Sequence, residues 1–278
     1  MAISSIARRA LKFAWIYCLF ATGALRRAKK KLQDSGALVV LTFHRILPER
    51  EYLRTSSQPG IVVREATFSS LVRYLRESCE LADLHSGPPT WSARALRPRL
   101  ALTFDDGWKD NFTTAFPILQ RSKAPWVVFV CPGLENRPFP FWPEQVMARR
   151  RPQFGAAATD RYIEHLKTLP PAERDAAVAA VSHAASLPDD ELLNATMTWA
   201  EMRSLHQSGV ALGSHTDTHQ ILTQLDDADV QAELKRSKEA LEDTLKVPCV
   251  LFAYPNGNVT EAVRNLVAAA GYQMAFST

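Results

Sequence analysis

No pair of cysteines in this chain has the close spacing of a metal-binding or redox motif. The four cysteines (Cys18, Cys79, Cys131 and Cys249) lie far apart, and each has apolar neighbours. Zinc ribbons and thioredoxin-like sites need two closely spaced cysteines, so neither kind of site fits this sequence. We therefore expect four buried free thiols, and the cysteines give no indication of an oxidising compartment.

The sequence also lacks an apolar run of the length that a simple transmembrane helix needs. The apolar stretch at residues 13–25 would extend about 20 Å as a helix, whereas the hydrocarbon core of a bilayer is about 30 Å thick. Basic residues flank this stretch on both sides. Residues 1–35 therefore form a separate basic and apolar segment, for which three interpretations stay open.

The first interpretation is an interfacial anchor, with aromatic and aliphatic side chains at the acyl boundary and the flanking cations at anionic headgroups. The second is a secretory signal peptide cleaved near residues 21–23, although the basic run that follows disfavours export. The third is an ordinary helix packed on the domain. We expect a membrane-associated protein that contacts the surface through residues 1–31 at the cytoplasmic face, with an exported or periplasmic protein as the alternative.

Acidic residues are absent from the first 31 positions, which carry eight Lys or Arg. The formal net charge of the whole chain is +4, yet the residues after position 31 comprise 25 basic and 29 acidic side chains. The body of the protein is thus mildly acidic. This balance argues against a nucleic-acid partner.

After residue 35, short apolar runs alternate with helical patterns, which is typical of an α/β domain with a largely parallel sheet. The 278-residue chain is 46% hydrophobic, enough for one domain with a large core. The expected strands are 37–43, 100–104, 126–131, 210–213, 249–253 and 273–277. Apolar faces with the helix period occur near 68–75 and 230–245, and a last helix is expected from Thr260 as N-cap to Gly271 as C-terminal stop.

Residues 157–193 are rich in alanine and acid-base pairs and contain Pro170 and Pro171. This composition predicts one or two helices inserted between strands, within an insertion of about 135–197. The insertion would serve as a lid or as a solvated prop. The catalytic domain would then span 36–278.

Two motifs with chemically useful side chains follow separate expected strands. Residues 103–107 read Thr-Phe-Asp-Asp-Gly, and residues 214–219 read Ser-His-Thr-Asp-Thr-His. A third segment, residues 254–257 (Tyr-Pro-Asn-Gly), follows another strand. Because reacting groups in parallel α/β folds gather beyond the carboxyl ends of the strands, we expect these segments to meet at one edge.

His215 and His219 would face the same side if a helical turn begins at Thr216, so that both rings could bind one ion. The third ligand would come from Asp105 or Asp106, because adjacent residues leaving a strand point in opposite directions. The other carboxylate would accept a proton from water during metal-assisted hydrolysis of an amide or ester. The Asp-Asp-Gly motif alone is more often a turn, and the His-x-x-x-His motif alone is more often a structural histidine pair. Their joint occurrence after separate strands favours a metal site.

These motifs, in this order and spacing, resemble the polysaccharide deacetylase family, also called the NodB-homology domain or carbohydrate esterase family four. The resemblance covers residues 38–278 and includes residues 252–257 (Phe-Ala-Tyr-Pro-Asn-Gly). Residues 111–119 and 197–209 look like the helices that follow the first motif and precede the second. The resemblance implies a distorted (β/α) barrel with seven strands, in a bacterial enzyme that removes N-acetyl groups from amino sugars and releases acetate.

The resemblance also implies roles for individual residues. Asp105 would be the general base, and Asp106, His215 and His219 would bind the metal. The resemblance implies zinc as the metal, with cobalt or nickel as the alternatives. The backbone N–H of Asn256 would help to hold the developing oxyanion.

The sequence departs from the family pattern at two places. Ala253 occupies the position of an arginine that often opens the third motif, so a salt bridge from that position to the base is not expected. The family's later segment, with a histidine that protonates the leaving amine, would follow Thr278, so we expect a chain truncated at its C-terminus with its last strand or strands missing.

Other residues are candidates for contact with substrate. His44 follows the first strand and could replace the missing acid, although a structural histidine is the stronger interpretation. Tyr254 and Pro255 would contact substrate beside Asn256. The aromatic side chains of Trp108, Phe141 and Trp142 could stack on sugar rings or could equally be core. The remaining histidines are interpreted as surface or packing residues: His85, His165, His183 and His206.

The sequence thus favours a metal-dependent N-deacetylase that acts on an N-acetylated polysaccharide or glycolipid precursor. The alternative is a catalytically weak relative that binds metal and carbohydrate within a polysaccharide assembly system.

Overall fold

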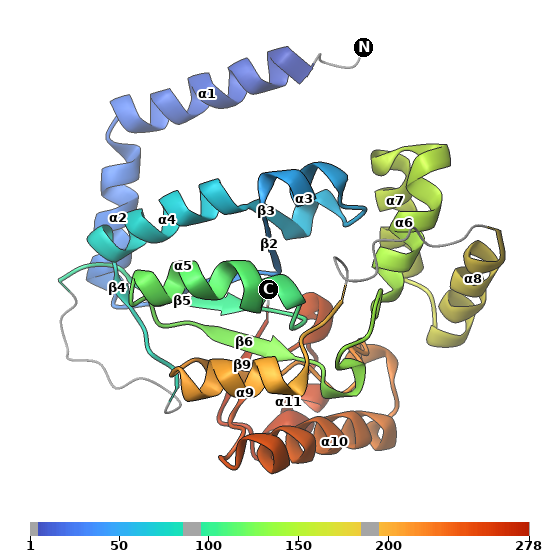
Figure 1. The fold of residues 1–278 in the computed structure, drawn as a ribbon. Coiled ribbons are helices and arrows are strands. Elements are labelled where there is room, and N and C mark those ends of the chain that lie inside the picture. Colours follow the sequence, from blue (N-terminus) through green and yellow to red (C-terminus); the bar gives the residue numbers. More distant parts are fainter. Residues whose placement is uncertain (1–4, 86–95, 185–194, 278) are drawn as a thin grey trace.

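The computed structural model describes residues 5–85, 96–184 and 195–277 of the chain. A curled sheet of seven strands, all paired in parallel, forms the centre of the molecule (Figure 1). Its strands are β1 (Leu38–Phe43), β4 (Glu80–Leu81), β5 (Arg99–Phe104), β6 (Val127–Val130), β7 (Ala211–Ser214), β8 (Leu251–Ala253) and β9 (Met274–Phe276). The expected α/β fold of the NodB-homology type is therefore confirmed, and its distorted barrel takes the form of a curled half-barrel.

The strand order is β1-β5-β6-β7-β8-β9. Strand β5 pairs with β1 along its whole length, and β4 and β6 pair with the start and the end of β5 respectively. A separate two-stranded sheet consists of β2 (Arg45–Leu47) and β3 (Val62–Arg64). Since every pairing in the main sheet is parallel, the carboxyl ends of its strands lie along one edge.

Helices surround the outside of the curled sheet, and their apolar side chains share one core cluster with alternate strand residues such as Leu102, Phe104 and Val128. The surrounding helices are α4 (Glu65–Ser78), α5 (Phe116–Arg121), α9 (Trp199–Gln207), α10 (Asp227–Leu245) and α11 (Glu261–Ala269). The alternate strand residues on the other face, among them Val127 and Phe129, form a second and smaller cluster. This division follows from the two-residue period of side chains along a strand.

Three of the α-helices between β6 and β7 lie within the residues expected to form an insertion: α6 (Trp142–Phe154), α7 (Ala156–Leu166) and α8 (Pro171–Ala184). They enclose a core cluster of their own that includes Val146, Met147 and Ile163. The expected helical stretch at 157–193 corresponds to α7 and α8, while residues 185–194 lie outside the described part of the chain.

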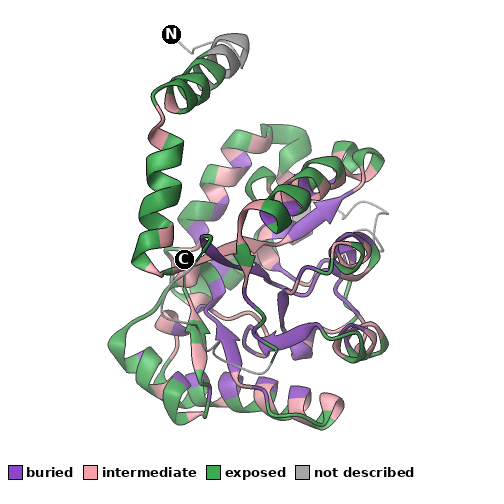
Figure 2. Ribbon diagram, turned by 90° about the vertical axis from the view of Figure 1, so that its left-hand side faces the viewer, coloured by how far each residue is buried: buried purple, intermediate pink, exposed green. Residues whose placement is uncertain are grey.

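The first two helices, α1 (Ser5–Ala21) and α2 (Ala24–Ser35), extend away from the body. Most of their described residues are exposed, as Figure 2 shows. The apolar stretch at residues 13–25 is divided between α1 and the start of α2. Gly23 adopts a left-handed conformation (φ 70°) between α1 and α2. Within the described residues, no helix has both the length and the apolar character needed to cross a bilayer.

All six expected strands are present, but β2, β3 and β4, which have two or three residues each, were not foreseen. The expected helix at 111–119 begins as a π-helix (Asn111–Ala115) and continues as α5. Short helices also occur: α3 (Glu49–Arg54) and the 3-10 turns η1 (Pro59–Ile61), η3 (Pro132–Leu134), η5 (Leu222–Gln224) and η6 (Pro255–Gly257).

The four cysteines are free, as expected, but they are not all buried. Cys131 and Cys249 are buried, whereas Cys79 is partly exposed and Cys18 is exposed. Cys18 lies on α1, which does not pack on the core. Burial of this thiol was therefore wrongly expected from its apolar neighbours in sequence.

Candidate active site

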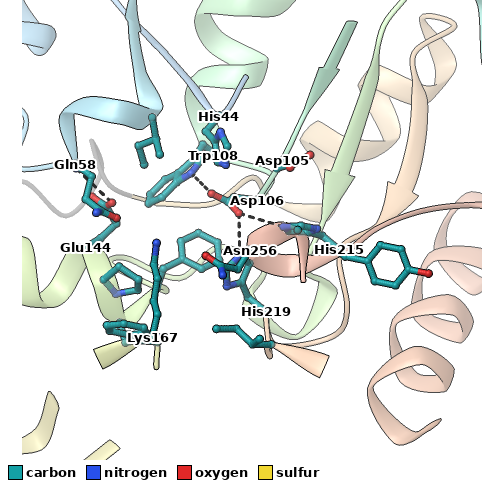
Figure 3. A pocket seen from close by; sticks show the side chains of 17 residues that line it. His44, Gln58, Asp105, Asp106, Trp108, Glu144, Lys167, His215, His219 and Asn256 are labelled. Atoms are coloured by element: carbon teal, nitrogen blue, oxygen red, sulfur yellow. Dashed lines mark hydrogen bonds and ion pairs between the residues drawn. The ribbon is translucent and has the colours of Figure 1, made fainter. Parts of the chain in front are cut away.

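A pocket opens at the carboxyl edge of the sheet, where the loops after four strands meet (Figure 3). Asp105 and Asp106 follow β5, His215 and His219 follow β7, and His44 follows β1. Asn256 lies on the loop after β8. The parallel pairing of these strands explains why residues so far apart in sequence reach one place.

Asp106, His215 and His219 form a group whose ligand atoms all lie within 4.8 Å of one another. Asp106 Oδ1 lies 3.6 Å from His215 Nε2 and 3.2 Å from His219 Nε2. Two imidazole nitrogens and one carboxylate oxygen are a donor set that divalent transition metals bind. The group is therefore a candidate metal centre.

His215 and Asp106 each use one side-chain atom in a hydrogen bond outside the group. These bonds orient the other atom of each side chain toward the candidate metal centre. His215 Nδ1 lies 2.9 Å from the carbonyl oxygen of Ala253. A carbonyl oxygen can only accept, so Nδ1 carries the proton and the lone pair is on Nε2. Asp106 Oδ2 accepts a hydrogen bond of 2.9 Å from Trp108 Nε1, while its buried Oδ1 has no hydrogen-bond partner in the described structure.

The electrostatic environment favours the forms of these groups that bind metals. Burial alone would raise the pKa of Asp106, but the close approach of His219 and the other imidazoles outweighs it and holds that pKa below its ordinary value. Burial and the neighbouring His219 lower the pKa of His215 to about 3. A carboxylate and a neutral imidazole are the protonation states that coordinate a metal ion. The buried Oδ1 without a partner and the free Nε2 atoms thus fit a divalent metal.

Asp105 is buried and lines the same pocket, but its carboxylate lies outside the group of three ligand atoms. Burial, and then the adjacent charge of Asp106, raises its pKa well above the ordinary value. The two carboxylates therefore differ in environment, and only Asp106 faces both imidazoles. This agrees with the expected division between one ligand and one separate carboxylate.

Gly107 allows the backbone to turn below the two carboxylates. Its φ is +70°, a conformation that L-residues rarely adopt, and an added Cβ would lie 2.9 Å from Val130 Cγ1. Val130 belongs to β6, so this strand is the neighbour that a side chain at position 107 would meet.

The loop that carries the two histidines is not helical, so the helical turn expected from Thr216 onward was wrong. Thr216 and His219 both have positive φ values, 64° and 60°. The imidazole centroids nevertheless lie 5.0 Å apart. The loop therefore brings the rings together by its tertiary contacts and not by a helical period.

The pocket includes most of the other residues expected to contact substrate. His44 and Tyr254 line it, and burial lowers the pKa of His44, which favours the neutral imidazole. Asn256 also lines it, with a positive φ of 58° and an Nδ2 that donates to Asn258 Oδ1 at 2.7 Å. Pro255 is buried and is absent from the described lining of this pocket.

The indole of Trp108 is fully buried, which supports the core interpretation over that of a sugar-stacking surface. Its ring packs against Phe141, with centroids 4.9 Å apart, and Phe141 in turn contacts the ring of His219. Trp142 is partly exposed and lines the pocket. Of the three aromatic candidates, Trp142 is thus the most accessible to a ligand.

Arg45 was not identified from the sequence, although it directly follows His44. It is fully buried, its Nε donates to Asp110 Oδ2 at 2.9 Å, and its guanidinium lies 4.3 Å from the centre of the Trp108 ring. The guanidinium thereby supports the tryptophan that binds Asp106.

Three polar residues that the sequence did not indicate complete the pocket wall: Gln58, Glu144 and Lys167. Glu144 lies on α6 and Lys167 directly follows α7, and Lys167 is the single Lys or Arg among the described lining residues. Burial raises the pKa of Glu144 to about 7, and its Oε2 lacks a hydrogen-bond partner in the described structure. No spacing pattern linked these residues to the motifs, because a different part of the chain supplies them.

The fold and the site together define an α/β half-barrel with a candidate metal centre and a second carboxylate, the arrangement of a hydrolytic enzyme. The family model for polysaccharide deacetylase matches residues 93–275, and the chain belongs to this family of hydrolases, the NodB-type deacetylases.

Similar proteins agree with this assignment. YxkH of Bacillus subtilis (strain 168), a proposed polysaccharide deacetylase, is 20% identical over 255 residues, which are 91% of this chain and 71% of YxkH. The Streptococcus pyogenes deacetylase PplD, solved in complex with acetate, has a TM-score of 0.56 and 18% identity over 87% of this chain and 83% of its own. IcaB from Ammonifex degensii has a TM-score of 0.56 and 20% identity over 86% and 83%. At these identities the two structures show the shared fold.

Proposed function

We propose that this chain is a metal-dependent N-deacetylase that hydrolyses the N-acetyl amide of an amino sugar in a polysaccharide or glycolipid precursor. The observation that carries the proposal is the meeting of Asp106, His215 and His219 with a second carboxylate, Asp105, in one pocket of a polysaccharide deacetylase fold. Acetate and a free amino sugar would be the products.

Asp106, His215 and His219 would hold the metal, and their nitrogen and oxygen donors suit zinc first, with cobalt or nickel as alternatives. A divalent ion bound there would supply Lewis acidity toward a water molecule and the acetyl carbonyl oxygen.

The protein groups would move the proton and hold the developing charge. Asp105 would accept a proton from water as the water attacks the acetyl carbon, since it is the pocket carboxylate adjacent to Asp106 that lies outside the candidate metal centre. The backbone N–H of Asn256 would donate to the carbonyl oxygen as that atom gains negative charge. This role needs no particular side chain.

The test combines metal analysis with acetate release from N-acetylated oligosaccharides, for the wild type, His215→Ala and Asp105→Asn. We expect one metal ion per wild-type chain, no tight metal in His215→Ala, and full metal but little acetate in Asp105→Asn. A wild-type chain that binds metal and releases no acetate at high enzyme concentration would refute the deacetylase proposal. Equal metal content in the wild type and His215→Ala would refute the site.

One observation favours the alternative of a catalytically weak binding protein. Ala253 places no cation beside the base, and the Asp105 carboxylate has no hydrogen-bond or ion-pair partner among the described residues. The same assay separates the alternatives, because a binding protein would hold metal and an N-acetylated oligosaccharide without releasing acetate.

We further propose that α1 and α2 place the protein on an anionic membrane surface at the cytoplasmic face. Four aromatic side chains of α1 are exposed, with Phe13 at 69%, Trp15 at 65%, Tyr17 at 72% and Phe20 at 74%. Helix α2 adds five basic residues and one acidic residue. Exposed aromatic rings beside a cationic helix suit the interface of a bilayer that contains anionic lipid.

Co-sedimentation with vesicles tests this surface. The wild type should bind vesicles that contain phosphatidylglycerol more tightly than pure phosphatidylcholine, and added salt should weaken the binding. A Trp15→Ser/Phe20→Ser variant should lose binding and keep its activity on soluble oligosaccharides. Equal binding of both proteins would refute the proposal, as would a stable dimer that covers α1.

A further inference from the structure

The loop from His215 to His219 needs support from outside itself, because it belongs to no helix or strand. Two of its residues, Thr216 and His219, have left-handed backbone conformations that cost free energy for residues other than glycine. His219 would be a ligand of the proposed metal. Whatever holds this loop therefore determines where one ligand lies.

A single carboxylate on helix α10 (Figure 1), that of Glu233, accepts three of the hydrogen bonds that the loop donates. Glu233 is buried, with 4% of its surface exposed. Its Oε2 accepts the backbone N–H groups of Asp217 and Thr218 at 3.0 and 2.8 Å. Its Oε1 accepts from Thr218 Oγ1 at 2.9 Å and from Arg236 Nη2 at 2.7 Å.

Arg236 and a residue of η3 also contact the loop, both at Asp217. Arg236 Nε donates to Asp217 Oδ2 at 2.8 Å, so one guanidinium joins the anchor to the loop. The carbonyl oxygen of Asp217 accepts the backbone N–H of Gly133 at 3.0 Å, and a Cβ on Gly133 would lie 2.8 Å from Asp217 Oδ1. The centre of the loop is thus held between α10 and η3.

We propose that Glu233 is a positioning residue that fixes the loop between the two histidines and thereby sets the affinity of the site for a divalent metal. The inference rests on the proposed metal centre but not on the identity of the substrate. A carboxylate has enough acceptor capacity for all four donors, two of which are backbone N–H groups that cannot change their chemistry. Without it, these N–H groups would need other partners and the loop would move, taking His219 with it.

Two substitutions of Glu233 and one control separate positioning from simple stabilisation. Glu233→Ala removes every acceptor. Glu233→Gln keeps one oxygen for the Asp217 and Thr218 N–H groups, but its NH2 group cannot accept from Thr218 or Arg236. The matched control is Glu239→Gln on the same helix, where the carboxylate is exposed and its ion pair with Lys235 is 3.8 Å long.

The experiment is a titration of metal-free wild type and variants with Co2+ and Zn2+ by calorimetry, with thermal unfolding of each protein in the absence of metal. We expect Kd to rise about 10- to 100-fold in Glu233→Ala, as for other residues that orient metal ligands, and less in Glu233→Gln. Glu239→Gln should match the wild type. At saturating metal, Glu233→Ala should show a lower kcat for acetate release with a similar KM.

If Glu233→Ala binds metal with the same Kd as the wild type, even with a lower Tm, the inference is overturned, because Glu233 would then only stabilise the fold. If Glu233→Ala does not fold, the Kd of Glu233→Gln decides in the same way. A wild type that binds metal but releases no acetate would refute the deacetylase proposal alone. A wild type that binds no metal would overturn the metal centre and this inference together.

Discussion

The indole nitrogen of Trp108 donates a hydrogen bond of 2.9 Å to Oδ2 of Asp106, and this bond leaves Oδ1 to face His215 and His219. Trp108 is fully buried, so the bond is shielded from solvent. A tryptophan two residues after the carboxylate thus decides which oxygen points at the candidate metal centre. The sequence left contact with sugar and packing in the core as equal alternatives for this side chain, and the structure shows it buried and hydrogen-bonded to Asp106.

Replacing the indole by a ring without a donor tests this role. In Trp108→Phe we expect metal affinity to fall about tenfold and the free energy of unfolding to fall by about 2 kcal/mol, since a buried hydrogen bond to a charged group is lost. Calorimetric titration and urea unfolding measure the two quantities. Trp142→Phe at the pocket wall is the control and should keep the wild-type metal affinity. Unchanged affinity in Trp108→Phe would show that Asp106 is oriented by other contacts.

Asp105→Asn should separate proton transfer from metal binding. The amide has nearly the shape of the carboxylate but cannot accept the proton of the attacking water. We therefore expect kcat for acetate release to fall by about two to four orders of magnitude, with an unchanged metal Kd. A comparable loss of metal in this variant would instead make Asp105 a ligand.

The buried carboxyl of Glu144 should make stability depend on pH. Burial raises its pKa from 4.5 to about 7 in the folded protein, with Arg45 as the main opposing charge. The folded state thus holds this proton more tightly than the unfolded chain does. Its stabilising contribution is full below pH 4.5 and is lost as the pH rises through about 7.

Glu144→Gln removes this titration. As the pH rises from acidic to mildly alkaline, the free energy of unfolding of the variant should increase relative to that of the wild type, by up to about 3 kcal/mol in total. Urea unfolding of both proteins at several pH values measures the difference. A difference that stays constant across this range would mean that Glu144 titrates alike in the folded and unfolded chains.

Gly107→Ala should destabilise the fold for two separate reasons. The positive φ costs about 1–2 kcal/mol for alanine, and the close approach to Val130 adds about 1–3 kcal/mol. Gly209→Ala is the matched control, because Gly209 has a φ of +83° with nothing within 4 Å of an added Cβ. The two variants, compared by urea unfolding, isolate the cost of the contact. Equal losses would show that β6 moves aside without cost.

The sequence alone determined the fold class and the approximate position of the candidate site. Alternating apolar runs and helix periods are local signals, and they located all six predicted strands, including β5 and β7. The parallel arrangement then requires residues after those strands to meet at one edge, so His215 and His219 could be grouped with Asp105 or Asp106 without coordinates. The choice of Asp106 as the ligand came from the family resemblance, and the structure places that residue with the two histidines. The motifs that resemble polysaccharide deacetylases gave the family, which the family model confirms.

The tertiary structure decided the details that depend on contacts between distant segments. The loop from His215 to His219 is held by Glu233 and not by a helical period, and Trp108 turns inward to bind Asp106. Lys167, directly after the inserted helix α7, lines the pocket with no spacing that connects it to a motif. Local periodicity reports which face of an element is apolar. A hydrogen bond such as that between the Thr218 N–H and Glu233 instead depends on how the whole chain packs. For this reason the sequence identified the chemical groups of the site, and only the folded structure showed how they are oriented.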